Sequence, residues 1–189
     1  MIIGPKKLLE LVKKIQLVED LAERELTNPE GAGFDLRLGE VYEISGEAFL
    51  GVEERQTPKI KLIKKHSSFA KASKDKQKAK KNKITIKPGE FYLVVTIEKV
   101  NIPKNIAAVF LPRTTTFRSG LFLRTGVGQP GYRGKLTFGL KNEGPVPVTL
   151  ELGCGIVHVQ FHWVDGGGSM YRGQWQGGRV TTKKRERQI

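Results

Sequence analysis

The sequence predicts an all-β domain that follows an N-terminal helix. After Gly33, short apolar runs alternate with glycine, proline and asparagine; they lie at residues 41–44, 59–63, 84–86, 91–97, 107–111, 136–140, 146–150 and 156–164. Runs of this length, separated by turn residues, are typical of a β-sandwich or β-barrel. Between residues 5 and 27 the leucines, isoleucines and valines recur near helical spacing instead, and Asn28-Pro29 ends the predicted helix.

The composition indicates one domain in a reducing compartment. The chain has 189 residues, 38% of them apolar, which suffices for a single core. No apolar run reaches the roughly eighteen residues of a membrane span, and the first residues do not have the layout of a signal peptide. The single cysteine, Cys154, cannot form an internal disulfide. We therefore expect a cytoplasmic protein with no membrane partner.

The net charge of +14 raises the question of nucleic-acid binding. Residues 64–83 contain nine lysines and one acidic residue, and residues 179–189 form a second basic stretch. Because the rest of the chain is close to neutral, the charge does not indicate a DNA-reading surface. We interpret residues 64–83 as a solvated, largely disordered insertion in a surface loop, with a nucleic-acid-binding arm as the alternative.

One segment indicates phosphate chemistry. Residues 113–120 read R-T-T-T-F-R-S-G, which places two arginines and three threonines within eight residues. Guanidinium groups match phosphate oxygens, and hydroxyls complete such a cradle. Taken alone, the segment is equally compatible with a surface turn whose arginines lie in water. A second cluster, Cys154, His158 and His162, has strand spacing but too few ligands for a closed zinc site.

Six segments, in order and with compatible spacing, carry the most specific signal. The central ones are R-T-T-T-F-R-S-G at 113–120 and Q-P-G-Y-R-G at 129–134, which continues into L-T-F-G-L-K-N at 136–142. G-F-D-L-R-L-G at 33–39 and the stretch 84–103 precede them; G-C-G-I at 153–156 with Phe161, and Y-R-G-Q-W-Q-G at 171–177, follow. Over residues 33–63 and 84–180 the chain thus resembles the dUTPase / dCTP deaminase family.

The resemblance implies a fold and an assembly. The expected structure is a distorted jelly-roll β-barrel of the dUTPase-like type that forms a homotrimer, with active sites at the subunit interfaces. Three parts follow: an N-terminal helical segment at 1–32, a barrel at 33–168 with the insertion at 64–83, and a C-terminal arm at 169–189 that closes over the nucleotide site. The implied ligand is a deoxypyrimidine triphosphate.

The resemblance also implies roles for individual residues. The residues expected to hold the triphosphate are Arg113, Thr114, Thr115 and Arg118. The residues expected around the deoxyribose and base are Gly131, Tyr132, Gly134 and Asn142. The residues of the arm expected to cover the phosphates are Tyr171, Arg172, Gln174 and Gln176. The expected catalytic set is Gln129, Asp35 and Arg118. Mg²⁺ is the expected cofactor because it neutralises the triphosphate, and Asp35 is expected to hold a water bound to that metal.

Two departures from the family pattern decide between functions. Deaminases of the family carry a glutamate where this chain has Gly139, and glycine cannot move the protons that deamination requires. The family's aspartate before Pro-Gly is Gln129 here, and an amide can orient water but cannot accept its proton. The sequence therefore favours a dUTP diphosphatase. The alternatives are a dCTP deaminase and a non-catalytic deoxynucleotide-binding trimer.

Overall fold

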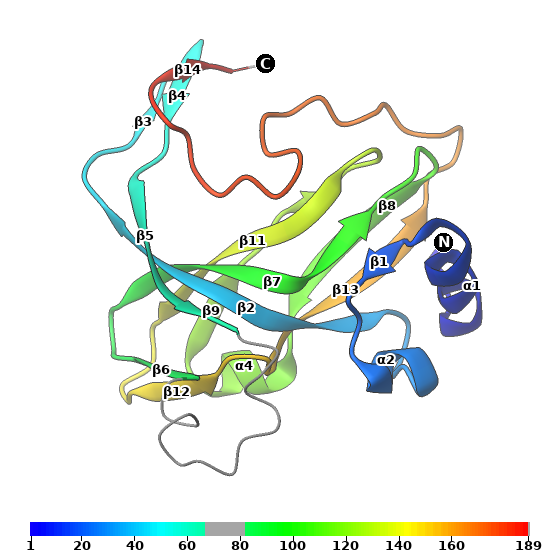
Figure 1. Cartoon of the computed structure of the whole chain (residues 1–189), viewed down its shortest axis with the longest axis horizontal. Helices are drawn as coiled ribbons and strands as arrows, with labels where there is room; N and C mark the ends of the chain where they lie inside the picture. Colours follow the sequence, from blue (N-terminus) through cyan, green and yellow to red (C-terminus); the bar gives the residue numbers. More distant parts are fainter. Residues whose placement is uncertain (67–81, 189) are drawn as a thin grey trace.

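One curled antiparallel sheet forms the body of the computed structural model (Figure 1). The strands follow the order β10-β8-β13-β2-β7-β11-β9, and β1 pairs with β7 while β5 pairs with β2. Their bounds are β1 Val18–Glu19, β2 Phe34–Ser45, β5 Lys59–Lys65, β7 Phe91–Asn101, β8 Ile106–Pro112, β9 Leu121–Arg124, β10 Val127–Gly128, β11 Arg133–Asn142 and β13 Gly155–Trp163. The all-β expectation is confirmed.

Among the residues that the structure describes, two small sheets and three helices complete the fold. One small sheet pairs β6 with β12, and the other runs β14-β4-β3 beside the C-terminus (Figure 1). The remaining bounds are β3 Phe49–Leu50, β4 Glu54–Gln56, β6 Lys83–Ile86, β12 Val148–Glu151, β14 Glu186–Arg187, α1 Pro5–Ile15, α2 Glu23–Thr27 and α4 Thr114–Arg118.

The structure describes residues 1–66 and 82–188. The lysine-rich segment expected at 64–83 therefore lies outside the described residues except at its ends. There, Lys64 and Lys65 belong to β5 and Lys83 begins β6, so the barrel strands reach further into the segment than the sequence predicts. No helix in the described ranges is long and apolar enough to cross a membrane.

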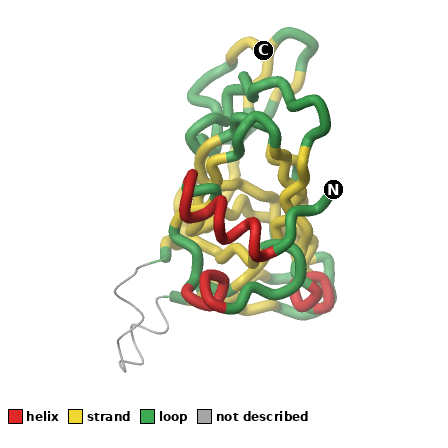
Figure 2. The backbone as a smooth tube through the Cα atoms, turned by 90° about the vertical axis from the view of Figure 1, so that its right-hand side faces the viewer, coloured by secondary structure: helices red, strands yellow, loops and turns green. Residues whose placement is uncertain are grey.

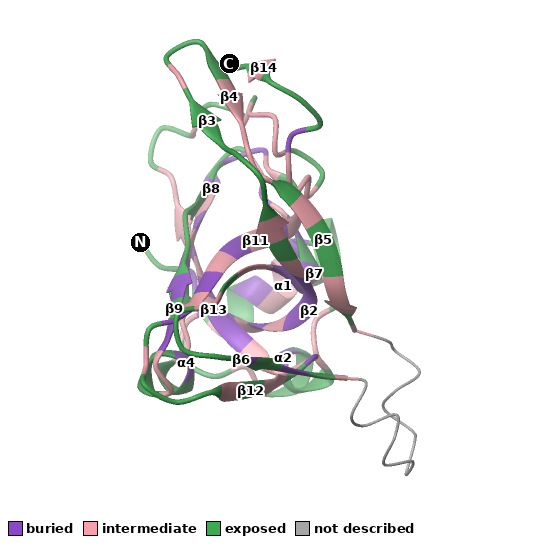
Figure 3. Cartoon of the chain, turned by 90° about the vertical axis from the view of Figure 1, so that its left-hand side faces the viewer, coloured by how far each residue is buried: buried purple, intermediate pink, exposed green. Residues whose placement is uncertain are grey.

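The core lies inside the curl of the sheet (Figure 3). Along β11, Leu136, Phe138 and Leu140 are buried, whereas Thr137 and Gly139 between them are only partly covered. This alternation is the pattern of a strand with one face on the core. It leaves Thr137 and Gly139 on the opposite face of β11, which becomes important for the site.

The N-terminal segment differs from the single helix expected over residues 5–27. It forms two helices, α1 and α2, separated by β1 (Figure 2). Gln16 ends α1 in a left-handed conformation, with φ of 53°, and its backbone N–H caps carbonyls of the last turn. Val18 then pairs with Val100 of β7 and is buried. Pairing and burial outweigh the helical periodicity here.

An ion pair between two motif residues joins β2 to β7. Arg37 donates from Nε to Glu98 Oε1 at 2.6 Å, and its backbone N–H donates to Glu98 Oε2 at 2.8 Å. Burial raises the pKa of Glu98, while the bonds from Arg37 oppose that shift. Because Glu98 is fully buried, removal of Arg37 would leave an unpaired charge in the core. We assign this pair to fold stability.

Candidate functional site

Asp35, His158 and Arg113 meet at the end of the barrel that carries α4. The β2–β13 register places Asp35 directly opposite His158, and β8, on the other side of β13, leads into Arg113. Arg113 Nε contacts Asp35 Oδ2 at 2.7 Å. His158 Nδ1 contacts Asp35 Oδ1 at 2.9 Å. Strand register therefore assembles this cluster from three segments that are distant in the sequence.

The carboxylate of Asp35 stays ionised in this cluster. Burial, the largest influence, raises its pKa, but the hydrogen bond from His158 and the charge of Arg113 together lower the pKa below its ordinary value. Both oxygens already have partners within the chain. In the described ranges, no group of three or more His, Cys, Asp or Glu side chains could hold a metal ion. Asp35 is thus engaged by two side chains of its own chain, and its expected contact with a metal-bound water stays a prediction. Among the described residues, Cys154, His158 and His162 do not form such a metal-binding group.

The short helix α4 presents part of the expected phosphate cradle to solvent. Thr114, Thr115 and Arg118 are exposed. Thr116, by contrast, is buried, and its hydroxyl donates to the Ile156 carbonyl at 3.2 Å. In the part of the chain that the structure describes, no carboxylate lies within ion-pair distance of Arg118. The exposed side chains can therefore receive a ligand, while Thr116 fixes α4 on β13.

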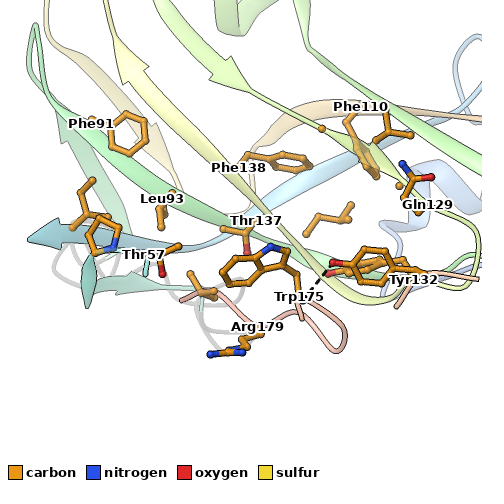
Figure 4. A pocket seen from close by; sticks show the side chains of 18 residues that line it. Thr57, Phe91, Leu93, Phe110, Gln129, Tyr132, Thr137, Phe138, Trp175 and Arg179 are labelled. Atoms are coloured by element: carbon orange, nitrogen blue, oxygen red, sulfur yellow. Dashed lines mark hydrogen bonds between the residues drawn. The ribbon is translucent and has the colours of Figure 1, made fainter. Parts of the chain in front are cut away.

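A cavity of about 510 Å³ lies at the opposite end of the barrel (Figure 4). It is bounded by β11 and β7, the turn before β11 and the C-terminal arm. The residues that line it are Ile44, Thr57, Pro58, Phe91, Leu93, Phe110, Gly126, Val127, Gly128, Gln129, Tyr132, Leu136, Thr137, Phe138, Tyr171, Trp175, Arg179 and Val180. Its wall is mostly apolar and aromatic with a few polar groups, as is usual for sites that bind small ring compounds.

The turn at residues 129–134 forms one side of the cavity. Gly131 has φ of 84° and Gly134 has φ of 136°, and a Cβ at Gly134 would lie 2.4 Å from the Gly178 nitrogen of the arm. Only glycine allows that close approach. Tyr132 is half-buried and donates from its hydroxyl to the Lys135 carbonyl at 2.6 Å. Burial, followed by the neighbouring Tyr171, raises the pKa of Tyr132 to about 12, so it stays a neutral ring.

The C-terminal arm folds onto this turn in the same chain. The rings of Tyr171 and Tyr132 meet edge to face, with centroids 5.4 Å apart. Gln176 accepts from the Arg133 backbone N–H and donates to the Gly131 carbonyl, both at 2.9 Å. The predicted lid thus contacts the predicted sugar turn directly. The side chains of Gln174 and Arg172 point elsewhere: Gln174 binds Arg55, and Arg172 is exposed beside Lys104.

The expected deaminase position is occupied differently. A Cβ at Gly139 would lie 3.0 Å from Cε2 and Cζ of Phe91, whose ring also lines the cavity. Phe91 therefore fills the space beside Gly139 that a longer side chain would enter. Next to it, Thr137 Oγ1 is buried and has no hydrogen-bond partner among the described residues. An unpaired buried hydroxyl at a cavity wall is a candidate for ligand recognition.

Asn142 is not part of the cavity within the chain. Its side-chain amide donates to the carbonyls of Ile86 and Val146 at 2.9 and 2.8 Å, and its Oδ1 accepts from the Gly144 backbone N–H at 3.0 Å. All of these bonds hold the turn after β11, and the residue is fully buried. Within the chain Asn142 therefore has a role in that turn, and its expected place in the base pocket stays a prediction.

The site residues fall into two groups that one chain keeps apart. Figures 1 and 3 place α4 at one end of the barrel and the C-terminal arm at the other. Gly128, beside Gln129, pairs with Ala108 of β8, and Arg113 follows five residues later. At about 3.3 Å per residue, the strand alone separates them by roughly 16 Å. Within one chain, the arginine and threonine group at α4 and the cavity therefore lie far apart.

Comparison with known proteins identifies the family of the chain. A family model described as dCTP deaminase-like matches residues 2–164. A probable deoxyuridine 5'-triphosphate nucleotidohydrolase from Methanothermobacter thermautotrophicus is 33% identical over 152 residues, which cover 80% of this chain and 89% of that protein. The chain belongs to the dCTP deaminase-like family.

Relatives in the family carry two kinds of name. A dCTP deaminase from Pyrococcus furiosus is 29% identical over 178 residues, covering 93% of this chain and 95% of that protein. The crystal structure of a 2'-deoxycytidine 5'-triphosphate deaminase from Agrobacterium tumefaciens superposes with a TM-score of 0.62 at 16% identity. It covers 85% of this chain, which spans 48% of the length of that one. That likeness shows the fold.

Three further residues at or beside the cavity were given no role from the sequence. Phe91 and Thr137 lie within the family segments 84–103 and 136–142, where no task was expected of their side chains, and Arg55 lies outside all six segments. Phe91 is one of many apolar strand residues, and Arg55 meets Gln174 across 119 positions of sequence. Trp175, inside the last motif, could be noted from its position in the arm, and it does line the cavity.

Proposed function

We propose that the protein, as a cytoplasmic homotrimer, hydrolyses dUTP to dUMP and pyrophosphate. The observation that carries this choice within the family is the contact between Gly139 and Phe91. Where deaminases of the family place a glutamate, this chain has no carboxyl group, and a side chain there would have to displace the Phe91 ring. Deamination would require that proton shuttle, whereas cleavage of a triphosphate depends mainly on positioning and charge neutralisation.

We place one active site across two chains. Arg113, Arg118 and the hydroxyls of Thr114 and Thr115 hold the phosphates, and the cavity of a neighbouring chain receives the sugar and base. The separation of the two groups in one chain, at opposite ends of the barrel (Figure 1), supports this arrangement. A closed threefold assembly repeats the same contact at each interface, so three sites would form.

Each residue then has a physical task. Asp35 holds Arg113 by its Nε, which leaves the terminal nitrogens for phosphate oxygens. The ring of Tyr132 lies against the deoxyribose, where its bulk excludes a 2′-hydroxyl. Gln129, exposed at the cavity edge, orients the attacking water through its amide. Because both Asp35 oxygens already bond Arg113 and His158, we propose that Mg²⁺ is held directly by the phosphates and arrives as the Mg–dUTP complex.

The direct test is a nucleotide panel assayed separately for pyrophosphate, phosphate and ammonia. With Mg²⁺, dUTP should release pyrophosphate, and dCTP should release no ammonia. A Gly139→Glu variant is the informative companion: the new carboxyl should fail to confer deamination while Phe91 occupies the adjacent space. Ammonia from dCTP with the wild-type protein would overturn the preference for hydrolysis.

A second candidate function is non-catalytic deoxynucleotide binding. The observation that favours it is Gln129, since no carboxylate stands at the position where the family has aspartate. Titration of the protein with dUTP, followed by tryptophan emission, separates the two. Saturable binding with no product from any nucleotide would establish the binding function in place of the hydrolase.

A further inference from the structure

The C-terminal arm is fastened to its own chain beyond the family motif. After Gly178 the chain reaches β14, which pairs with β4 of the hairpin β3–β4, so this small sheet closes over the arm (Figure 3). Thr181 and Thr182 bond Thr57 directly after β4, and Gln188 Nε2 donates to the Gly51 carbonyl at 2.5 Å. We call residues 49–57 with 179–188 the clip.

Arg55, in the 49–57 part of the clip, contacts Gln174 and Trp175 of the arm. Its guanidinium carbon lies 4.7 Å from the centre of the Trp175 ring, and Nη2 donates to Gln174 Oε1. Arg55 Nε lies 3.8 Å from Glu186 Oε1 in β14. The side chain is only 15% exposed, so these contacts act in a poorly hydrated place where cation–π and charged hydrogen bonds are strongest.

A second arginine of the clip, Arg179, also lies near the Trp175 ring. Arg179 lies 5.8 Å from the Trp175 ring and pairs with Glu186 at 2.8 Å. Glu186 therefore lies near both Arg55 and Arg179, and both guanidinium groups lie close to the Trp175 ring. Trp175 in turn lines the cavity, together with Tyr132 and Thr137 (Figure 4). A movement of Arg55 would therefore change the cavity wall through the Trp175 ring.

Two buried atoms show that Arg55 holds this place at some cost. Arg55 Nε and Glu186 Oε1 are both buried and lack a hydrogen-bond partner in the described part of the chain. A buried polar atom without a hydrogen bond destabilises the folded chain. Packing on Trp175 and the bond to Gln174 compensate for that cost and keep the guanidinium on the arm.

We propose that Arg55 is a positioning residue that holds the arm closed over the cavity of its own chain before any nucleotide binds. The proposal rests on the assignment of the cavity as the nucleotide site. An arm that is already ordered loses little conformational freedom on binding. Arg55 should therefore act on substrate affinity and on the environment of Trp175, with little effect on the chemical step.

The test compares Arg55→Ala with Arg185→Ala, a matched control on the same clip. Arg185 also lies over an aromatic ring, 4.0 Å from Phe49, and pairs with Glu54, but it touches nothing in the cavity. For dUTP, Arg55→Ala should raise KM by about tenfold or more, the loss expected for a cation–π contact and a charged hydrogen bond together. Its kcat should stay near wild type, and Arg185→Ala should change neither.

A second readout does not depend on turnover. In a Trp163→Phe background, emission of nucleotide-free protein reports Trp175 alone. Arg55→Ala should shift that emission to longer wavelength, and Arg185→Ala should not. Arg55→Lys, which keeps the charge but loses the planar fork, should fall between them and covers the case in which the alanine variant does not fold.

The outcomes separate the two proposals. A shifted Trp175 emission in a protein that never cleaves dUTP would retain the positioning role and refute the hydrolase. Unchanged emission and unchanged KM in both Arg55 variants, with wild-type cleavage of dUTP, would refute the positioning role alone.

Discussion

Asp35 holds Arg113 Nε at 2.7 Å with one carboxylate oxygen and His158 Nδ1 at 2.9 Å with the other. This relationship gives a motif residue a task within the chain, because each carboxylate oxygen of Asp35 bonds another side chain of the cluster. It also explains how an arginine at a strand end is kept in one orientation. The half-site at α4 is thus built before a phosphate arrives, which reduces the cost of binding.

Replacement of Asp35 by asparagine should affect phosphate affinity and leave the Mg²⁺ dependence unchanged. Asparagine keeps the shape but gives up the charge that fixes Arg113, so KM for dUTP should rise by about tenfold, within the range for a charged hydrogen bond. The concentration of Mg²⁺ that gives half-maximal rate should stay the same. A marked rise in that concentration would show that Asp35 is a metal ligand after all.

The same pair predicts a pH dependence of stability. The cluster holds the pKa of folded Asp35 below its ordinary value of 3.8, so its contribution to stability is present above pH 3.8 and is lost as the pH falls through the lower, folded pKa. The difference in free energy of unfolding between wild type and Asp35→Asn should be constant above about pH 5 and shrink below it. Urea titrations across this range measure it, and a difference that grows toward acid would contradict the assignment.

Arg118 and Arg124 offer a matched comparison of two exposed arginines. Arg118 ends α4 beside Arg113, whereas Arg124 lies on β9 over Phe122 and faces Glu143. Arg118→Ala should weaken dUTP binding by about 1.5–3 kcal/mol, the cost of a lost charged phosphate contact. Arg124→Ala should have almost no effect. Equal losses in isothermal titrations would mean that the phosphate cradle is placed wrongly.

Gln129→Asp restores the family's usual residue and asks whether the site has adapted to the amide. Gln129 is exposed and its carbonyl accepts from the Tyr132 backbone N–H at 3.1 Å, a bond that any side chain allows. We expect lower kcat/KM for dUTP, because a new carboxylate would repel the phosphates. Gln129→Asn is the control for length. A gain of about tenfold or more, the low side of what a positioned base contributes, would instead identify an eroded hydrolase.

Thr137→Val tests whether the unpaired hydroxyl in the cavity serves the ligand. The two side chains have the same shape, and removal of a buried unpaired hydroxyl should preserve or raise Tm. Affinity for dUTP should fall, since a base contact is lost. Thr149→Val is the control, because that hydroxyl pairs with Thr85 on the distant β6–β12 sheet. Unchanged affinity in Thr137→Val would remove the hydroxyl from the site.

Most of the long strands were predictable because each contains a short apolar run bounded by turn residues. The short strands β4 and β14 were not, because they consist of polar residues. The segment between α1 and α2 was not, since its apolar residues follow helical spacing by coincidence. Leu17 and Val18 are buried in the structure by a strand partner more than eighty positions away, Val18 against Val100. Left-handed Gln16 and Asp20, with φ of 53° and 60°, frame that strand and have no marker in the sequence.

The site residues likewise divide into those that the sequence could predict and those that it could not. Tyr132, Gln129 and Tyr171 could be placed from motifs, and all three line one cavity. The sequence could not indicate that Asp35 is already engaged by Arg113, because strand register decides it. For Asn142 the motif indicates only that the residue is needed. Within the chain its side chain bonds Ile86 of β6 and the turn after β11, and a contact with the base stays a prediction.

The central claim is that one active site for dUTP combines α4 of one chain with the cavity of another. Mixing two inactive variants tests it: Arg118→Ala damages only the α4 half-site, and Tyr132→Leu, which keeps an apolar side chain, damages only the cavity. In randomly mixed trimers about one quarter of the interfaces would join two intact halves. The account predicts that pyrophosphate release from dUTP returns to about that fraction of wild type. A mixture as inactive as either variant alone, with mixed trimers demonstrated, would contradict it.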